Sequence, residues 1–271
     1  MNLNYKKMIT ELDEKGFIKV ESVYSCEQMD EVKKEYASVK ENFKILQYDA
    51  GVGKECTNAT HHTILMCPKM LKLLDPNPLH DFIEYYFNGK YILYTMGASS
   101  KMPNAEYVYT QRIHREFYTF TFGQKLMLNT LIVLDDSTQD AAATWMLEGS
   151  HKSDKNPTSE YFYNNAVQVT AKKGDVLIFD ANIWHAAGVN KTDKPVEIIT
   201  PLYTKPFIKQ SLNYPRAFGL DFQYTISEEL KQTLGYNAII PETIQEFYKT
   251  EDKRFYKRNQ EDKYGSNNPH M

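Results

Sequence analysis

The spacing of hydrophobic positions changes near Tyr91, from a helical repeat to short β-type segments. Before that point, Ser25 begins a predicted helix, because Gln28 three residues later completes a capping box. The apolar face of this helix consists of Met29, Val32, Tyr36 and Val39. Residues 16–20 alternate as a short strand, and two further helical segments, 71–74 and 79–87, are separated by the breaker DPNP.

Short β-type segments follow one another from about residue 91 to about residue 205, with turn residues between them. They cover residues 91–96, 117–122, 125–134, 143–147, 166–170, 176–179 and 196–203. Because no helical pattern intervenes, the strands are expected to pair antiparallel in a sandwich or barrel. Helices return at 227–230 and 241–247, each with acidic residues in its first turn.

This order predicts a single domain over residues 1–271, mostly β with flanking helices. A helical part of about 1–90 precedes the β core of about 91–205, and a helical part of about 206–260 follows it. No internal repeat or low-complexity segment interrupts the pattern.

Composition excludes several classes of partner. The chain has 32 basic and 35 acidic residues, so its formal charge of −3 gives no general attraction to nucleic acid or to anionic membranes. Its longest apolar stretch, 126–134, is far shorter than the roughly 20 residues of a spanning helix. The charged N-terminus does not read as a signal peptide. We therefore expect a cytoplasmic protein whose partner is a small-molecule substrate.

Candidate chemistry begins at His114-Arg115-Glu116, the one place where an acid follows a histidine by two residues. On a strand, His114 and Glu116 share a face while Arg115 points away. A third ligand from a distant strand completes a two-histidine, one-carboxylate facial triad, which leaves metal positions open. His185 follows the apolar segment 176–179 and offers that ligand. Both features also have an explanation without a metal. A chain of this composition is expected to contain about one such histidine–acid pair by chance, and a lone histidine near an apolar strand is commonly a core residue.

Three motifs in order resemble the phytanoyl-CoA dioxygenase family. They are LDD at 134–136, EGSHK at 148–152 and GDVLIFDANIWHAAGVN at 174–190. The resemblance extends over about 16–215. It implies a double-stranded β-helix of the jelly-roll, cupin-like type with flanking helices, and it implies Fe(II), 2-oxoglutarate and O2 as the reacting partners.

The resemblance also assigns residues. It places His114, Glu116 and His185 as the iron ligands, with Glu in place of the commoner Asp. The implied reaction couples decarboxylation of 2-oxoglutarate, which gives succinate and CO2, to hydroxylation of a small or carrier-bound metabolite. The retained carboxylate argues against the halogenating variants of this chemistry, in which halide takes its place.

Two positions depart from the family pattern. The family arginine that pairs with the far carboxylate of 2-oxoglutarate falls on Val196, and a frequent hydroxyl residue falls on Ala187. A buried, unpaired carboxylate is costly. Either another cation replaces the arginine, or the metal works without 2-oxoglutarate, or the protein is a catalytically silent β-barrel binding protein of the same fold.

Lys125 and Asn129 are the candidate replacements, because both fall on one face of the predicted strand 125–134. Lys125 has a simpler alternative as a solvent-exposed residue beside the turn at Gly123. The substrate candidates near the triad in sequence are Arg112, Tyr118, His151 and Trp184, for which a core or rim role is equally open. The segment 56–67, with His61 and His62, matches no zinc module and suits a loop over the pocket mouth.

Overall fold

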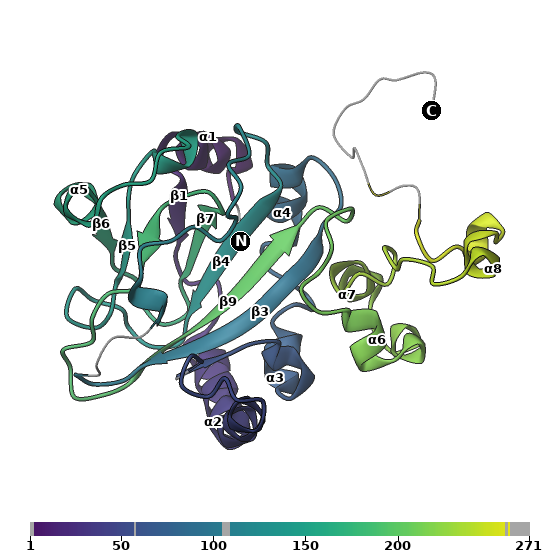
Figure 1. Ribbon diagram of the computed structural model, residues 1–271, viewed down its shortest axis with the longest axis horizontal. Coiled ribbons are helices and arrows are strands. Elements are labelled where there is room, and N and C mark those ends of the chain that lie inside the picture. Colours follow the sequence, from purple (N-terminus) through teal and green to yellow (C-terminus); the bar gives the residue numbers. More distant parts are fainter. Residues whose placement is uncertain (1–2, 57, 105–108, 258–259, 261–271) are drawn as a thin grey trace.

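A six-stranded antiparallel sheet forms the centre of the computed structural model, which describes residues 3–56, 58–104, 109–257 and 260 (Figure 1). Its strand order is β1-β7-β4-β9-β3-β2, and every neighbouring pair is antiparallel. The strands are β1 (Phe17–Val20), β2 (Ala59–Thr60), β3 (Ile92–Lys101), β4 (Met127–Val133), β7 (Val176–Asp180) and β9 (Val196–Thr204). The predicted mostly antiparallel core is confirmed.

A second sheet has three short antiparallel strands in the order β6-β5-β8. They are β5 (Thr144–Met146), β6 (Val167–Val169) and β8 (His185–Ala186). In this sheet His185 lies opposite Met146. This pairing places His185, one of the predicted metal ligands, on a regular β-strand.

The two faces of the main sheet have different roles, and the alternation along β4 shows how the sequence divides them. Leu128 and Ile132 belong to the large hydrophobic core that also contains residues of the helices. Asn129 and Leu131 point to the opposite face and line a cavity. Because successive side chains of a strand alternate between faces, one face of the sheet packs on helices and the other faces the cavity.

The N-terminal helices are α1 (Tyr5–Lys15), α2 (Cys26–Asp49), α3 (Pro68–Lys72) and α4 (His80–Phe87). Helix α2 begins at the predicted capping box, in which Ser25 and Gln28 each bond to the other's backbone N–H. Its buried residues Met29, Val32 and Tyr36 pack in the core on the helix side of the sheet. Figure 1 shows α2 and α3 together below the long strands.

The later helices are α5 (Ser159–Asn165), α6 (Tyr214–Phe218), α7 (Glu228–Thr233) and α8 (Ile244–Phe247). Helix α7 begins after the cap Ser227, as predicted, whereas α8 covers only the second half of the predicted segment 241–247. Figure 1 shows α6, α7 and α8 beyond one end of the main sheet. Within the described ranges, none of the helices is long and apolar enough to cross a membrane.

The predicted strand at 117–122 is wrong. The segment pairs with no described strand, and the residues Tyr118 and Phe122 are 83% and 84% exposed. Its backbone is held instead by one buried side chain, Asn182, whose amide donates to the carbonyls of Phe117 and Thr119. These bonds replace a strand ladder, so the aromatic and β-branched composition of the segment does not decide its conformation.

Candidate metal centre and its cavities

The side chains of His114, Glu116 and His185 converge on one point. Nε2 of His185 lies 3.4 Å from Oε1 of Glu116, and Nε2 of His114 lies 4.0 Å from the same oxygen. The three ligand atoms are all within 4.8 Å of one another. Two imidazoles and one carboxylate in this arrangement are a donor set that suits Fe(II).

The backbone explains how residues so distant in sequence meet. His114 and His185 form an isolated antiparallel bridge, in which each N–H donates to the other's carbonyl at 3.0 Å. The N–H of Glu116 donates to the carbonyl of Ala181 at 3.1 Å. His114 and Glu116 therefore project together as the spacing predicted, although they lie in an irregular segment rather than on a strand.

Each histidine is oriented through its other ring nitrogen. Nδ1 of His114 lies 2.7 Å from the carbonyl oxygen of Arg112, and Nδ1 of His185 lies 3.1 Å from that of Ile183. A carbonyl only accepts, so each Nδ1 carries the proton and donates it. Both Nε2 lone pairs are thereby left free toward Glu116, which is the tautomer that a metal ligand requires.

The charge state also suits a cation. Burial, together with the neighbouring His185 ring, lowers the pKa of His114 to about 4. Burial raises the pKa of Glu116, but the neighbouring His185 and His114 rings and a hydrogen bond from Asn129 outweigh it and hold this pKa below its ordinary value. At neutral pH the centre therefore combines a neutral His114 and an ionised Glu116, the protonation states that bind metal.

Asn129 faces the interior, as predicted, but its nearest partner is a metal-ligand candidate. Its side-chain N–H donates to Oε1 of Glu116 at 2.9 Å. The residue is buried on β4 and lines the cavity. This contact orients the carboxylate.

A cavity of about 160 Å³ opens on the three convergent side chains. Besides these, its walls include Gly97, Ser99, Lys101, Thr110, Asn129 and Ala187. His61 also lines it, which places the segment around residue 61 at the cavity, as suggested for a loop over its mouth. A small space beside the centre, with several polar side chains in an otherwise apolar wall, suits a compact ligand that carries polar groups.

Lys101 is the cavity residue that sequence reasoning missed. Its side chain is buried at the end of β3, where its ammonium donates to the hydroxyl oxygen of Thr110. Burial lowers its pKa to about 8. Alternation along the strand could have identified it, because residues two apart share a face. Gly97, Ser99 and Lys101 are small or polar, and all three line the cavity.

Lys125, by contrast, does not line this cavity, which corrects the prediction made for it. Its ammonium forms an ion pair of 3.0 Å with Asp13 and lies 5.2 Å from the ring centre of Tyr86. The reason is that β4 begins only at Met127, so the alternation that relates Asn129 to residues of the strand does not extend back to Lys125.

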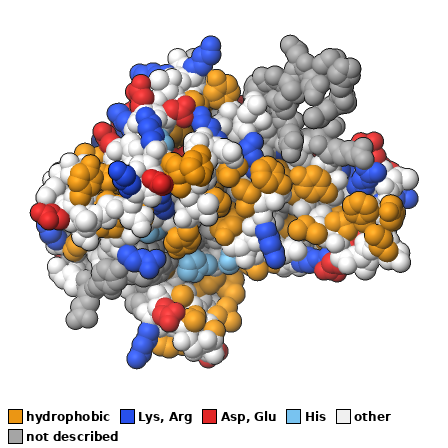
Figure 2. Space-filling model, turned by 45° about the horizontal axis from the view of Figure 1, so that its top comes forward, with side chains coloured by type: hydrophobic (Ala, Val, Ile, Leu, Met, Phe, Trp, Pro, Cys, Tyr) orange, Lys and Arg blue, Asp and Glu red, His pale blue; other side chains and the backbone are white. Residues whose placement is uncertain are grey.

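A second cavity, of about 440 Å³, is also lined by His114. Three predicted substrate residues line it: Arg112, Tyr118 and Trp184. Beside them, the guanidinium of Arg115 stacks 4.6 Å from the Trp184 ring. Figure 2 shows one face of the molecule on which histidine side chains reach the surface beside hydrophobic and basic ones.

The fourth predicted substrate residue, His151, is placed elsewhere. Its Nε2 lies 3.2 Å from the carbonyl oxygen of Asp13, and its ring packs against Gly16 at the end of α1. His151 lines neither cavity. The prediction followed its closeness to the triad in motif order, whereas the turn at Ser150 directs the side chain toward the N-terminal helix.

The model of the family described as phytanoyl-CoA dioxygenase matches residues 12–196. The chain belongs to this family. As a member of the phytanoyl-CoA dioxygenase family it is an enzyme of the dioxygenase class, whose cofactors are Fe(II) and 2-oxoglutarate, as the sequence predicted.

Curated relatives agree with this membership. An uncharacterized protein of Mycobacterium tuberculosis is 30% identical over 198 residues, which cover 73% of this chain and 71% of that protein. A dioxygenase of Aspergillus fumigatus is 29% identical over 117 residues, 41% of this chain and 37% of its own length.

Solved structures show the same fold. The non-haem α-ketoglutarate-dependent epimerase SnoN of nogalamycin biosynthesis matches with a TM-score of 0.59 at 16% identity, over 74% of this chain and 82% of its own. The enzyme EctD of S. alaskensis, solved with 2-oxoglutarate and 5-hydroxyectoine, also has a TM-score of 0.59 at 16% identity, over 74% and 76%.

Proposed function

We propose that this member of the phytanoyl-CoA dioxygenase family hydroxylates a small or carrier-bound molecule, with His114, Glu116 and His185 as the iron ligands. The observation that carries the proposal is the convergence of these three side chains on one point beside a cavity. In this proposal the two antiparallel sheets form a double-stranded β-helix around the metal, and residues 1–271 act as one oxygenase domain.

The roles of the protein groups follow from their contacts. His114 and His185 present Nε2 because their Nδ1 protons are donated to backbone carbonyls. Asn129 fixes the orientation of Glu116. Three ligands on one side leave the opposite positions open. When bound, iron, 2-oxoglutarate and O2 supply the oxidising chemistry for a substrate C–H bond, with succinate and CO2 as co-products.

The substrate is proposed to occupy the second cavity, which meets the metal centre at His114. Arg112 offers a cation at its wall, and Tyr118 and Trp184 offer aromatic surfaces. These side chains favour a substrate that combines an anionic group with an apolar or planar part. Such a combination is compatible with a small acid or with a metabolite joined to a phosphate-containing carrier.

Anaerobic titration with Fe(II), with and without 2-oxoglutarate, tests the proposal. The expected result is one bound iron per chain and a weak visible metal-to-ligand band that needs both components. Two alternative functions predict different results. Both are considered because Val196 and Ala187 depart from the family pattern for binding 2-oxoglutarate. Iron without the band would indicate an oxygenase that does not use 2-oxoglutarate. Absence of iron binding would indicate a binding protein of the same fold.

A further inference from the structure

Lys101 is a buried cation that lines the cavity of the metal centre. The residue is 4% exposed, and the one hydrogen bond of its ammonium to a described residue goes to the hydroxyl of Thr110. Among the residues that the structure describes, no carboxylate pairs with it. The nearby Glu197 is engaged elsewhere, because Lys40 and Ser100 donate to it. An unpaired buried charge is costly unless a ligand compensates it.

The position of Lys101 in the sheet adds a second, independent observation. In the β3–β9 ladder, Lys101 is the direct partner of Val196, the position where the family pattern has an arginine. Residues directly opposite one another in an antiparallel pair project from the same face with their Cβ atoms about 5 Å apart. Lys101 therefore brings a positive charge to the cavity wall from the strand next to the one on which the family pattern has its arginine.

The second departure has a matching neighbour. The N–H of Ala187, the position without its hydroxyl, donates to the carbonyl of Thr110 at 2.9 Å. The hydroxyl of Thr110 is the one that bonds to Lys101, and Ala187, Thr110 and Lys101 all line the cavity of the metal centre. Lys101 and Thr110 thus supply a cation and a hydroxyl beside Val196 and Ala187, the two positions where the family pattern has an arginine and a hydroxyl residue.

We propose that Lys101, with Thr110 beside it, binds the far carboxylate of 2-oxoglutarate in this protein. The inference rests on the proposed function, since it takes the other end of the co-substrate to lie at the iron. The ammonium has donor protons to spare beyond its bond to Thr110, and a carboxylate would supply both their acceptor and the missing negative charge.

The test compares two ligands that differ only at that carboxylate. Calorimetry under anaerobic conditions, on the Mn(II)-loaded protein, gives the dissociation constants of 2-oxoglutarate and of 2-oxopentanoate, which ends in a methyl group. We expect the wild type to prefer 2-oxoglutarate by tenfold or more. In Lys101→Met this preference should fall to nearly one, while the affinities for Mn(II) and for 2-oxopentanoate stay close to wild type.

The controls separate this role from a general or structural effect. Lys194, whose side chain is exposed near the same end of the sheet, gives the matched variant Lys194→Met, which should keep the full preference. Adding Val196→Arg to Lys101→Met should restore the preference from the neighbouring strand. Because Lys101→Met removes an unpaired buried charge, its melting temperature without ligand should not fall; Lys101→Gln provides the same comparison if Met is not tolerated.

The outcomes distinguish the inference from the function beneath it. A wild type that binds metal and 2-oxoglutarate, with an unchanged preference in the folded Lys101 variants, would overturn the inference alone. A wild type that prefers neither ligand would overturn it as well. A wild type that binds no metal, or no 2-oxo acid, would overturn the proposed function and the inference together.

Discussion

The side-chain amide of Asn129 donates a hydrogen bond of 2.9 Å to Oε1 of Glu116, the proposed carboxylate ligand. Groups that orient metal ligands in this way typically contribute tenfold to a hundredfold to metal affinity. Asn129→Ala should therefore weaken Fe(II) binding by about that factor, because Glu116 loses a donor that holds its orientation. Anaerobic titration with a competing chelator measures the change.

The neighbouring residue provides the control for this prediction. Thr130 is buried on the same strand, but its hydroxyl donates to the carbonyl of Pro201, away from the metal centre. Thr130→Val should lower stability without changing the affinity for Fe(II). Equal iron affinities in Asn129→Ala and wild type would remove Asn129 from the site.

Removing a proposed iron ligand should lower iron binding more than removing a hydrogen bond that orients a ligand. His185→Ala removes one of three proposed ligand atoms, so iron occupancy at equimolar Fe(II) should fall sharply. His151→Ala is the matched control, since it deletes a histidine that lies against the end of α1 and outside both cavities. Metal analysis of the desalted proteins gives the result, and full loading of His185→Ala would refute the assignment.

The sequence was informative where the deciding interactions are local. The capping box at Ser25 and Gln28 needs only neighbouring residues, and the structure has both of its bonds. The alternation that turns Asn129 inward is likewise a property of one strand. The spacing of His114 and Glu116 brought these side chains together even without a strand, because the bridge to His185 extends the backbone there.

The errors arose where distant residues decide. Segment 117–122 has strand composition, but Asn182, far along the chain, binds its backbone instead. Lys101 acquires its place through the β3–β9 register, which pairs it with Val196. Register depends on the whole sheet rather than on the sequence of either strand, so the alternation of one predicted strand, 125–134, did not reveal Lys101. It pointed instead to Lys125, which lies outside β4 and pairs with Asp13.

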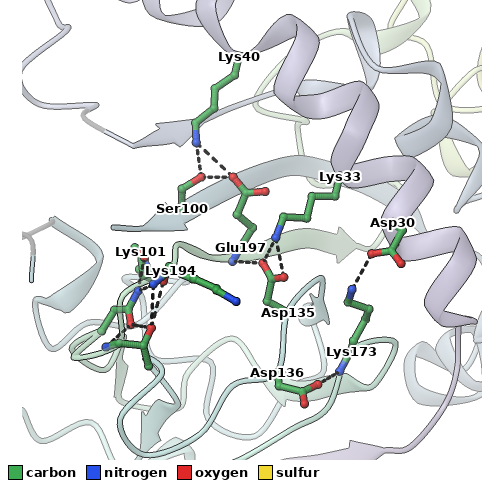
Figure 3. Close-up of polar contacts among 12 residues, drawn as sticks. Asp30, Lys33, Lys40, Ser100, Lys101, Asp135, Asp136, Lys173, Lys194 and Glu197 are labelled. Atoms are coloured by element: carbon green, nitrogen blue, oxygen red, sulfur yellow. Dashed lines mark hydrogen bonds and ion pairs between the residues drawn. The ribbon is translucent and has the colours of Figure 1, made fainter. Parts of the chain in front are cut away.

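A charge network fastens helix α2 to the end of the sheet that carries Lys101. Lys40 of α2 bonds to Ser100 and, at 3.2 Å, to Glu197, and Lys33 pairs with Asp135, as Figure 3 shows. The Glu197 side chain is only 9% exposed. Lys40→Met leaves this buried carboxylate with fewer partners, so the free energy of unfolding should fall by about 2 kcal/mol.

Denaturant unfolding of Lys40→Met and Lys44→Met makes the comparison direct. Lys44 lies one turn further along α2, where it pairs at 3.5 Å with the exposed Glu41. Its replacement should change the free energy of unfolding by no more than about 0.5 kcal/mol. Equal losses in the two variants would show that the Glu197 contact contributes nothing particular to stability.

The proposed role of Lys101 predicts a pH dependence with a definite sign. Burial disfavours the charged form and lowers the pKa of Lys101 to about 8 in the free site. Below that pH the ammonium is charged, and affinity for 2-oxoglutarate should be highest. Above it, binding must take up a proton, so the dissociation constant should rise by up to about tenfold per pH unit. The rise in the dissociation constant ends once pH passes the pKa of Lys101 in the complex, which the bound carboxylate raises.

Calorimetry on the Mn(II)-loaded protein from about pH 6.5 to 9 measures this slope. Lys101→Met should lack it, and so should 2-oxopentanoate on the wild type; the same slope in Lys101→Met would assign the titration to another group.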